Sequence, residues 1–279
     1  MPIVVTEQVV YTIELALLLL GVFLLWRHVW SPAARARLRF APSALPPWSV
    51  SPSEFLFFTF VIVIGALIAS AAAGVALRAF PLSTDAVTVV GSAAFQVGLL
   101  IGPCLLPLKL GHPALLPPLD RTTLRSGLAT FLIALPVVTV TSLLWLGFLK
   151  LAGLPAEQQD LLRMFAQADS KTLLAVMIVL ATLIAPITEE LLFRATIFRY
   201  LRTRIPRWLA LVLPGLLFAS LHVNWSTLDG LASFAPLTAL AVVFSLGYER
   251  TGRIGTAMVA HAIFNLHTIL VLFAGLTPP

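Results

Sequence analysis

The sequence predicts an all-α integral membrane protein, a bundle of about eight transmembrane helices. Of its 279 residues, 59% are hydrophobic and only 11% are charged, and the mean hydropathy is +0.99. A soluble globular domain carries about 25% charged residues. The apolar residues also gather in runs close to the roughly 20 residues that a helix needs to cross the hydrocarbon core. The length suits one compact membrane domain and leaves no room for a second large soluble domain.

Eight apolar segments are expected to span the membrane. The sixth is short and contains Pro214, so it fits the criterion least well. The first four contain only scattered polar groups, such as Glu14 and Gln96, and we expect residues 1–151 to form an N-terminal transmembrane scaffold. The last four contain clustered polar groups and form a C-terminal core, residues 172–273. The eight predicted spans are 9–29, 54–77, 86–106, 124–151, 172–198, 208–223, 231–248 and 254–273.

Basic residues between the spans predict the orientation of the chain. Thirteen lysines and arginines fall in the odd-numbered loops and four in the even-numbered loops, while Arg194 lies within a span. Because cytoplasmic loops carry the excess of Lys and Arg, the odd-numbered loops are expected in the cytoplasm. This placement also explains the net charge of +6 without a nucleic-acid partner. We expect an integral protein of the bacterial inner (cytoplasmic) membrane, with the lipid bilayer as its surroundings.

Two further features restrict the class of protein. Cys104 is the single cysteine, which excludes an intrachain disulfide and a cysteine-based zinc site. The first apolar run follows Glu7 and precedes Arg27, with the next basic residues at 35, 37 and 39. A secretory signal has its positive charge before the apolar run, so we expect a retained first span.

The first polar cluster is Glu189, Glu190 and Arg194 in the fifth predicted span. Charged groups at membrane depth cost several kcal/mol unless they are paired or hydrated, so a functional site is the default interpretation. Residues i and i+4 share a helix face, so Arg194 is expected to pair with Glu190. Neighbouring residues point about 100° apart. Glu189 is therefore free to face water or another helix.

Two further clusters lie in later spans. Phe218 and His222 end the sixth, and His261 and Asn265 share a face of the eighth because they are four residues apart. A carboxylate and an imidazole in a confined wet pocket can activate water as general base and acid. A second imidazole and an amide N–H can stabilise an oxyanion. Together these groups fit amide hydrolysis without a covalent enzyme intermediate.

These three motifs together resemble those of the CAAX protease and bacteriocin-processing family, whose members are glutamic-type intramembrane endopeptidases related to the type II CAAX prenyl endopeptidase. The resemblance covers residues 172–273, just over a third of the chain. It implies that Glu189 activates the attacking water with His222, and that His261 and Asn265 form the oxyanion site. It assigns Glu190 and Arg194 to structural support. The helix-phase argument separates the two glutamates in the same way.

The resemblance implies an intramembrane endopeptidase that cleaves membrane-associated proteins or peptides and needs no metal or other cofactor. A zinc-dependent membrane metalloprotease is an alternative, because His222, His261 and a glutamate are possible ligands, although an H-E-x-x-H helix is absent from the sequence. A non-catalytic membrane scaffold or immunity protein is another. In that case the glutamates and Arg194 form a structural ion cluster and Asn265 only joins helices. The sequence indicates neither the substrate nor the oligomeric state.

Overall fold

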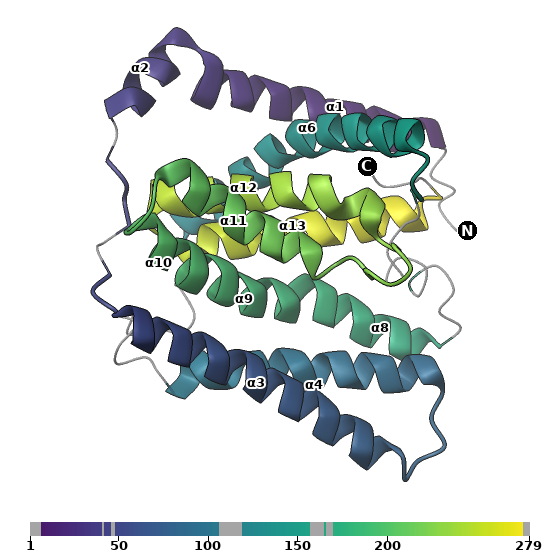
Figure 1. Ribbon diagram of the computed structural model, residues 1–279. Helices are drawn as coiled ribbons and strands as arrows, with labels where there is room; N and C mark the ends of the chain where they lie inside the picture. Colours follow the sequence, from purple (N-terminus) through teal and green to yellow (C-terminus); the bar gives the residue numbers. More distant parts are fainter. Residues whose placement is uncertain are drawn as a thin grey trace.

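The structure is a computed structural model, in which the described residues are 7–40, 42–45, 48–105, 119–156, 165 and 170–275. Within these ranges the secondary structure is helical except for one isolated β-bridge, between Asn224 and Asp229. The long helices run roughly antiparallel to one another, so that α1 begins and α13 ends on the same side of the molecule (Figure 1). The predicted all-α fold is confirmed.

The described residues of the N-terminal part form helices of very different length. A single apolar rod consists of α1 and a terminal π-helical turn, η1, and is followed by the short α2. The capping box of Ser51 and Glu54 starts α3, where each residue's side chain bonds the other's backbone N–H. Asp120 starts α6 by accepting from the N–H of Thr123. The bounds are α1 Glu7–Leu25, η1 Trp26–Trp30, α2 Pro32–Phe40, α3 Pro52–Leu77, α4 Thr84–Leu105 and α6 Arg121–Ala152.

The C-terminal part begins with one continuous rod that changes helix type four times between Lys171 and Arg202. The helices that follow it are separate and are joined by short turns. The bounds are α8 Lys171–Val179, η2 Leu180–Ile184, α9 Ala185–Glu190, η3 Leu191–Phe198, α10 Arg199–Arg202, α11 Arg207–Ser220, η4 Leu231–Ser233, α12 Phe234–Thr251 and α13 Ile254–Phe273.

Each of the eight predicted spans coincides with one of these apolar rods. Six of the rods in the described residues are long and apolar enough to cross a membrane. The other two are shorter apolar helices of 10–17 residues: Thr84–Leu100 within α4, and α11, Arg207–Ser220. The number of eight spans is therefore not confirmed, while the positions of the helices agree with the prediction.

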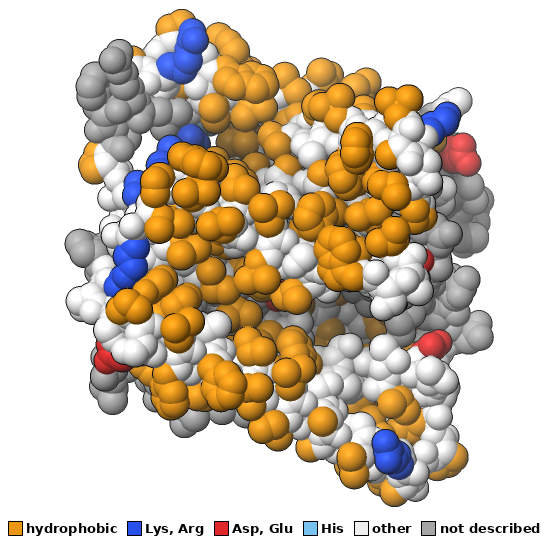
Figure 2. Space-filling view, viewed as in Figure 1, with side chains coloured by type: hydrophobic (Ala, Val, Ile, Leu, Met, Phe, Trp, Pro, Cys, Tyr) orange, Lys and Arg blue, Asp and Glu red, His pale blue; other side chains and the backbone are white. Residues whose placement is uncertain are grey.

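The largest apolar core lies between α6, α12 and α13. Phe131, Phe198, Phe244 and Tyr248 are almost fully buried there. The hairpin of α3 and α4 packs on the other side of the molecule and reaches the core through α8 and α9 (Figure 1). The visible face is mostly hydrophobic, with many Lys and Arg side chains at the end where α2 and α10 lie (Figure 2).

One polar pair ties the first helix to the last. His267 Nε2 of α13 lies 2.9 Å from Glu14 Oε2 of α1, and the imidazole packs 5.6 Å from the ring of Phe131. Neither His267 nor His28 belongs to a motif, and His112 lies outside the described residues. The pair connects α1 to α13, while α1 packs mainly along α6.

Candidate active site

The helix that carries the first motif is irregular around Pro186. Proline lacks an N–H and clashes with the carbonyl four residues earlier, which disfavours a regular α-helix at that point. The turn before it, η2, is π-helical, and the N–H of Ala185 donates to the carbonyl of Leu180. In that register the carbonyl of Ala181 would bond the N–H of residue 186, which proline does not have. The chain leading to the glutamates therefore contains a backbone carbonyl without a helical partner.

Asn265 of α13 provides the missing donor. Its Nδ2 donates to the carbonyl of Ala181 at 2.7 Å. Because a buried carbonyl must be hydrogen-bonded, this contact explains an amide at that position on α13. An amide nitrogen has two hydrogens, so one remains available after this bond. The contact joins α13 to η2 about two helical turns before Glu189.

Glu190 and Arg194 form the predicted ion pair. Arg194 Nη1 lies 2.9 Å from Glu190 Oε1, and the side chains are 1% and 0% exposed. The contact is ionic and lacks the alignment of a hydrogen bond, since Nη1 has no hydrogen-bond partner among the described residues. The guanidinium also lies 5.0 Å from the ring centroid of Phe218 and 5.7 Å from that of Phe244, as a cation–π contact requires.

His261 lies between the two glutamates. Its Nδ1 is 2.8 Å from Glu190 Oε1, and its Nε2 is 3.8 Å from Glu189 Oε2. An ionised carboxylate only accepts hydrogen bonds, so Nδ1 carries a proton and Nε2 is the nitrogen that faces Glu189. Glu190 therefore contacts two groups, Arg194 and His261, of which only the first was expected. No signal in the sequence pointed to the second contact, because it joins residues on different helices.

Glu189 faces away from the buried pair, as the helix phase predicts. Its side chain is 17% exposed, against 0% for Glu190. Gln96 of α4 donates from Nε2 to Glu189 Oε1 at 3.4 Å, and the hydroxyl of Thr188 donates to the amide oxygen of Gln96. The site therefore includes a residue from the N-terminal half. The signal in the sequence that could have pointed to this residue was Gln96 itself, a polar side chain within an apolar segment.

His222 lies just beyond the end of α11. Its Nδ1 is 2.8 Å from the carbonyl of Phe218. A carbonyl only accepts, so Nδ1 carries the proton and Nε2 has a free lone pair. The ring of Phe218 contacts both imidazoles, with centroids 4.6 Å from that of His222 and 6.1 Å from that of His261. Within the described residues, His222 has no direct contact with either glutamate.

The four candidate catalytic residues lie on three segments: Glu189 in α9, His222 just beyond α11, and His261 and Asn265 in α13. Of these, His261 is the residue that lies close to both glutamates. Among the described residues, no group of three or more His, Cys, Asp or Glu side chains is placed to hold a metal ion.

Comparison with known proteins agrees with the family resemblance that the motifs predict. Residues 171–267 match the family model described as type II CAAX prenyl endopeptidase Rce1-like, which confirms the predicted family resemblance. A curated relative, the UPF0177 protein YbdI of Lactococcus lactis, is 30% identical over 94 residues. That alignment covers 33% of this chain and 46% of the relative, so the chain spans about half the length of that relative. No solved structure matches the chain.

Proposed function

From the match of residues 171–267 to the Rce1-like family, we propose that this protein is a glutamic-type intramembrane endopeptidase that hydrolyses peptide bonds of membrane-associated proteins or peptides. The observation that carries the proposal is His261, held between a buried and a more accessible glutamate. A partly exposed carboxylate can act as general base towards a water molecule, and an imidazole held beside it can take part in the proton transfers.

In the proposed reaction, Glu189 and His222 activate a water molecule. Glu189 accepts a proton from the water as its oxygen attacks the peptide carbonyl, and a tetrahedral oxyanion forms. The C–N bond then breaks, and the nitrogen of the leaving amine takes up the transferred proton, with His222 assisting through Nε2. Products are a carboxylate and an amine. Gln96 orients Glu189 through its amide contact with the carboxylate.

His261 and Asn265 are the proposed oxyanion donors. As an imidazolium, His261 donates from Nδ1 to Glu190 and offers Nε2–H to the site. Asn265 offers the amide hydrogen that the carbonyl of Ala181 does not use. Loss of one such donor typically costs about 10²–10³-fold in kcat. Glu190 and Arg194 hold His261 in place and are positioning residues.

We further propose that the chain lies in a bacterial inner membrane with its odd-numbered loops in the cytoplasm. The bases in these loops support the orientation, because Arg202, Arg204, Arg207 and Arg250 all lie near the ends of α10, α11 and α12 on the side where α2 lies (Figure 1).

The test compares membranes of cells that produce the wild-type protein, Glu189→Gln or Glu190→Gln, by quantitative mass spectrometry of new peptide termini. Glu189→Gln should abolish the cleavage products, a loss of about 10²–10⁴-fold for a missing general base, and leave Tm nearly unchanged. Glu190→Gln should lower stability by about 3–5 kcal/mol, because it leaves Arg194 buried without its countercharge.

Two controls accompany this comparison. His222→Ala should lose the same products, and a chelator added to the wild-type protein should leave them intact. If folded Glu189→Gln and His222→Ala proteins yield the wild-type products, the protein is not a protease of this kind. If the chelator abolishes them, the metalloprotease alternative is supported instead.

A further inference from the structure

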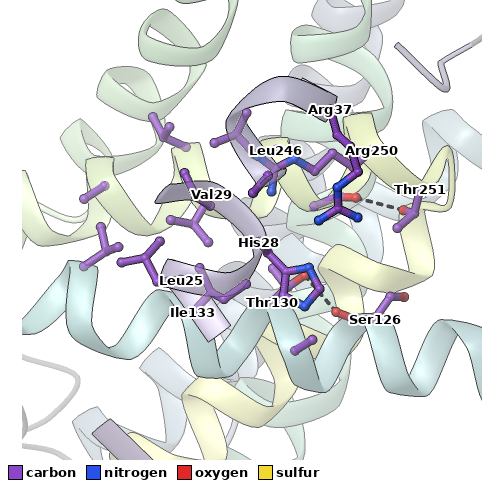
Figure 3. Close-up of a pocket in the computed structure, with 17 residues that line it drawn as sticks. Leu25, His28, Val29, Arg37, Ser126, Thr130, Ile133, Leu246, Arg250 and Thr251 are labelled. Carbon is purple, nitrogen blue, oxygen red and sulfur yellow. Dashed lines mark hydrogen bonds between the residues drawn. The ribbon is translucent and has the colours of Figure 1, made fainter. Parts of the chain in front are cut away.

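A large cavity lies apart from the candidate active site, between the start of the chain and the central helices. Its volume is about 710 Å³, and it is lined by α1, η1, α2, α6 and α12 (Figure 3). None of its lining residues takes part in the site described above. Cavities that bind small ligands usually have volumes of about 300–1,000 Å³, so this one is large enough for a sizeable molecule.

Most of the cavity wall is apolar and follows the helix axes. The lining residues on α6 extend from Ser126 to Val137 and those on α12 from Ala239 to Thr251. At 1.5 Å per residue, these stretches cover about 16–18 Å. One leaflet of a hydrocarbon core about 30 Å thick has nearly the same depth. The cavity therefore has the length and polarity of a site for one acyl chain.

One end of the cavity is basic. His28, Arg37 and Arg250 line it, and Figure 3 shows Arg37, Arg250 and Thr251 at one end, with Leu25 and Ile133 farther inside. Both arginines are exposed. In the described part of the chain neither guanidinium has an ion-pair partner, since Glu249, next to Arg250, is bound by Arg202 and Arg207.

An apolar cavity with a basic end fits an amphiphilic ligand. An apolar chain of leaflet length would fill the cavity, and an anionic group would meet the guanidinium groups, which bind phosphate well through their planar fork of donors. We propose that the cavity binds one anionic phospholipid, with an acyl chain between α1, α6 and α12 and its phosphate between Arg37 and Arg250. The inference does not depend on the proposed proteolytic activity.

The experiment measures lipid binding to the purified full-length protein in a neutral detergent by native mass spectrometry. The probes are phosphatidylglycerol, phosphatidylcholine, oleate and inorganic phosphate. We expect one molecule of phosphatidylglycerol to bind with an affinity at least about tenfold higher than that of phosphatidylcholine, which carries no net charge, since each Arg near an anionic group contributes about 1 kcal/mol. Inorganic phosphate alone should not bind at the concentration at which phosphatidylglycerol binds.

Two variants locate the site. Arg37→Gln/Arg250→Gln should weaken phosphatidylglycerol binding about tenfold, and its matched control is Arg35→Gln/Arg125→Gln, which removes two exposed arginines outside the cavity. Ala129→Phe should block the chain channel from α6, whereas Leu128→Phe, on the exposed face of the same helix, should not. Tm of every variant is measured beforehand, so that a misfolded protein is recognised.

Several results would overturn the proposal. Equal binding of phosphatidylcholine, or phosphatidylglycerol binding that both arginine pairs weaken alike, would mean nonselective lipid contact. Oleate binding as tight as phosphatidylglycerol would show that the phosphate is not recognised. Binding of inorganic phosphate by itself would identify a phosphate site rather than a lipid site.

Discussion

The carbonyl of Ala181 depends on a side chain from another helix, because Pro186 supplies no N–H in the register of η2. Asn265→Ala should therefore destabilise the protein by about 1 kcal/mol, the usual size of an interhelical hydrogen bond in a membrane. Pro186→Ala restores a backbone donor at that turn. Asn265→Ala should therefore cost less stability in the Pro186→Ala protein than in the wild-type protein. A double-mutant cycle of unfolding in mild detergent and SDS measures this coupling.

Additive effects in that cycle would mean that Asn265 does not compensate for Pro186. The activity of Asn265→Ala provides a second reading, because the proposed oxyanion role predicts a loss of kcat in the folded variant that the stability change does not explain.

Asp120 gives a pH dependence at the start of α6. The backbone N–H of Thr123, and then the guanidinium of Arg253, lower the pKa of this carboxyl from 3.8 to about 2. A lowered pKa adds stability above the unfolded value, and this contribution is lost as the pH falls through the folded value. The stability difference between wild type and Asp120→Asn should thus be constant from pH 8 to 5 and shrink between about pH 4 and 2.

Thermal unfolding of the two proteins across this pH range checks the expectation. Since Asp120 and Arg253 are both exposed, high salt should reduce the difference as well. A difference that grows on acidification would contradict the assigned pKa.

At this scale the sequence predicts contacts within a helix better than contacts between helices. The Glu190–Arg194 pair follows from i,i+4 spacing. The contacts of His261 with Glu190 and of Gln96 with Glu189 depend on how three helices are rotated in the bundle. A helix that is apolar nearly all round does not reveal its inward face, so neither contact was predictable.

At the scale of elements, one buried carboxylate joins the ends of three helices. Glu249 of α12 is 4% exposed and lies 2.6 Å from Arg202 Nε of α10 and 2.8 Å from Arg207 Nη2 of α11. Glu249→Gln should lower the free energy of unfolding by about 1–3 kcal/mol, the cost of a buried polar group that loses a charged partner. The two arginines are partly exposed, which keeps the loss below that of a fully buried pair.

Unfolding in SDS checks this prediction, with Glu7→Gln as the comparison, because Glu7 is an exposed carboxylate in the first turn of α1. If Glu249→Gln left stability unchanged, the contact would be one of the many ion pairs that contribute nothing measurable.

The positions of the elements were predictable because apolar run length indicates a membrane helix directly. The π-helical turns were not, because they leave no periodic signal in the sequence; only η2, which ends just before Pro186, has a visible local cause.

At the scale of the whole molecule, the all-α membrane fold was predictable but the number of crossings was not. Composition alone indicates the fold class. The two helices outside the six are α4, whose apolar stretch is counted over Thr84–Leu100, and α11, which has 14 residues and contains Pro214. Their ability to span depends on local bilayer thickness and packing, which the sequence does not contain.

The proposed orientation gives a prediction about all loops together. In a Cys104→Ser background, Ser49→Cys and Ser226→Cys each introduce one exposed thiol, the first between α2 and α3 and the second between α11 and α12. A membrane-impermeant maleimide should label Ser226→Cys in intact cells or spheroplasts and label Ser49→Cys only after lysis. The opposite pattern would invert the assignment, and labelling of both would contradict the proposed crossing pattern.

The amide of Gln96 has a consequence for anyone who wishes to transplant the family-matched segment into another protein. Gln96 lies on α4, which precedes residues 171–267 in the chain. The family-matched stretch therefore does not contain every residue of the candidate site. A chimera that grafts 171–267 onto a foreign set of N-terminal helices would leave Glu189 without this neighbour. Co-producing α3 and α4 as a separate fragment is the natural way to complement such a chimera. The same reasoning favours choosing donors and recipients by the residue that replaces Gln96, rather than by identity over the matched stretch alone.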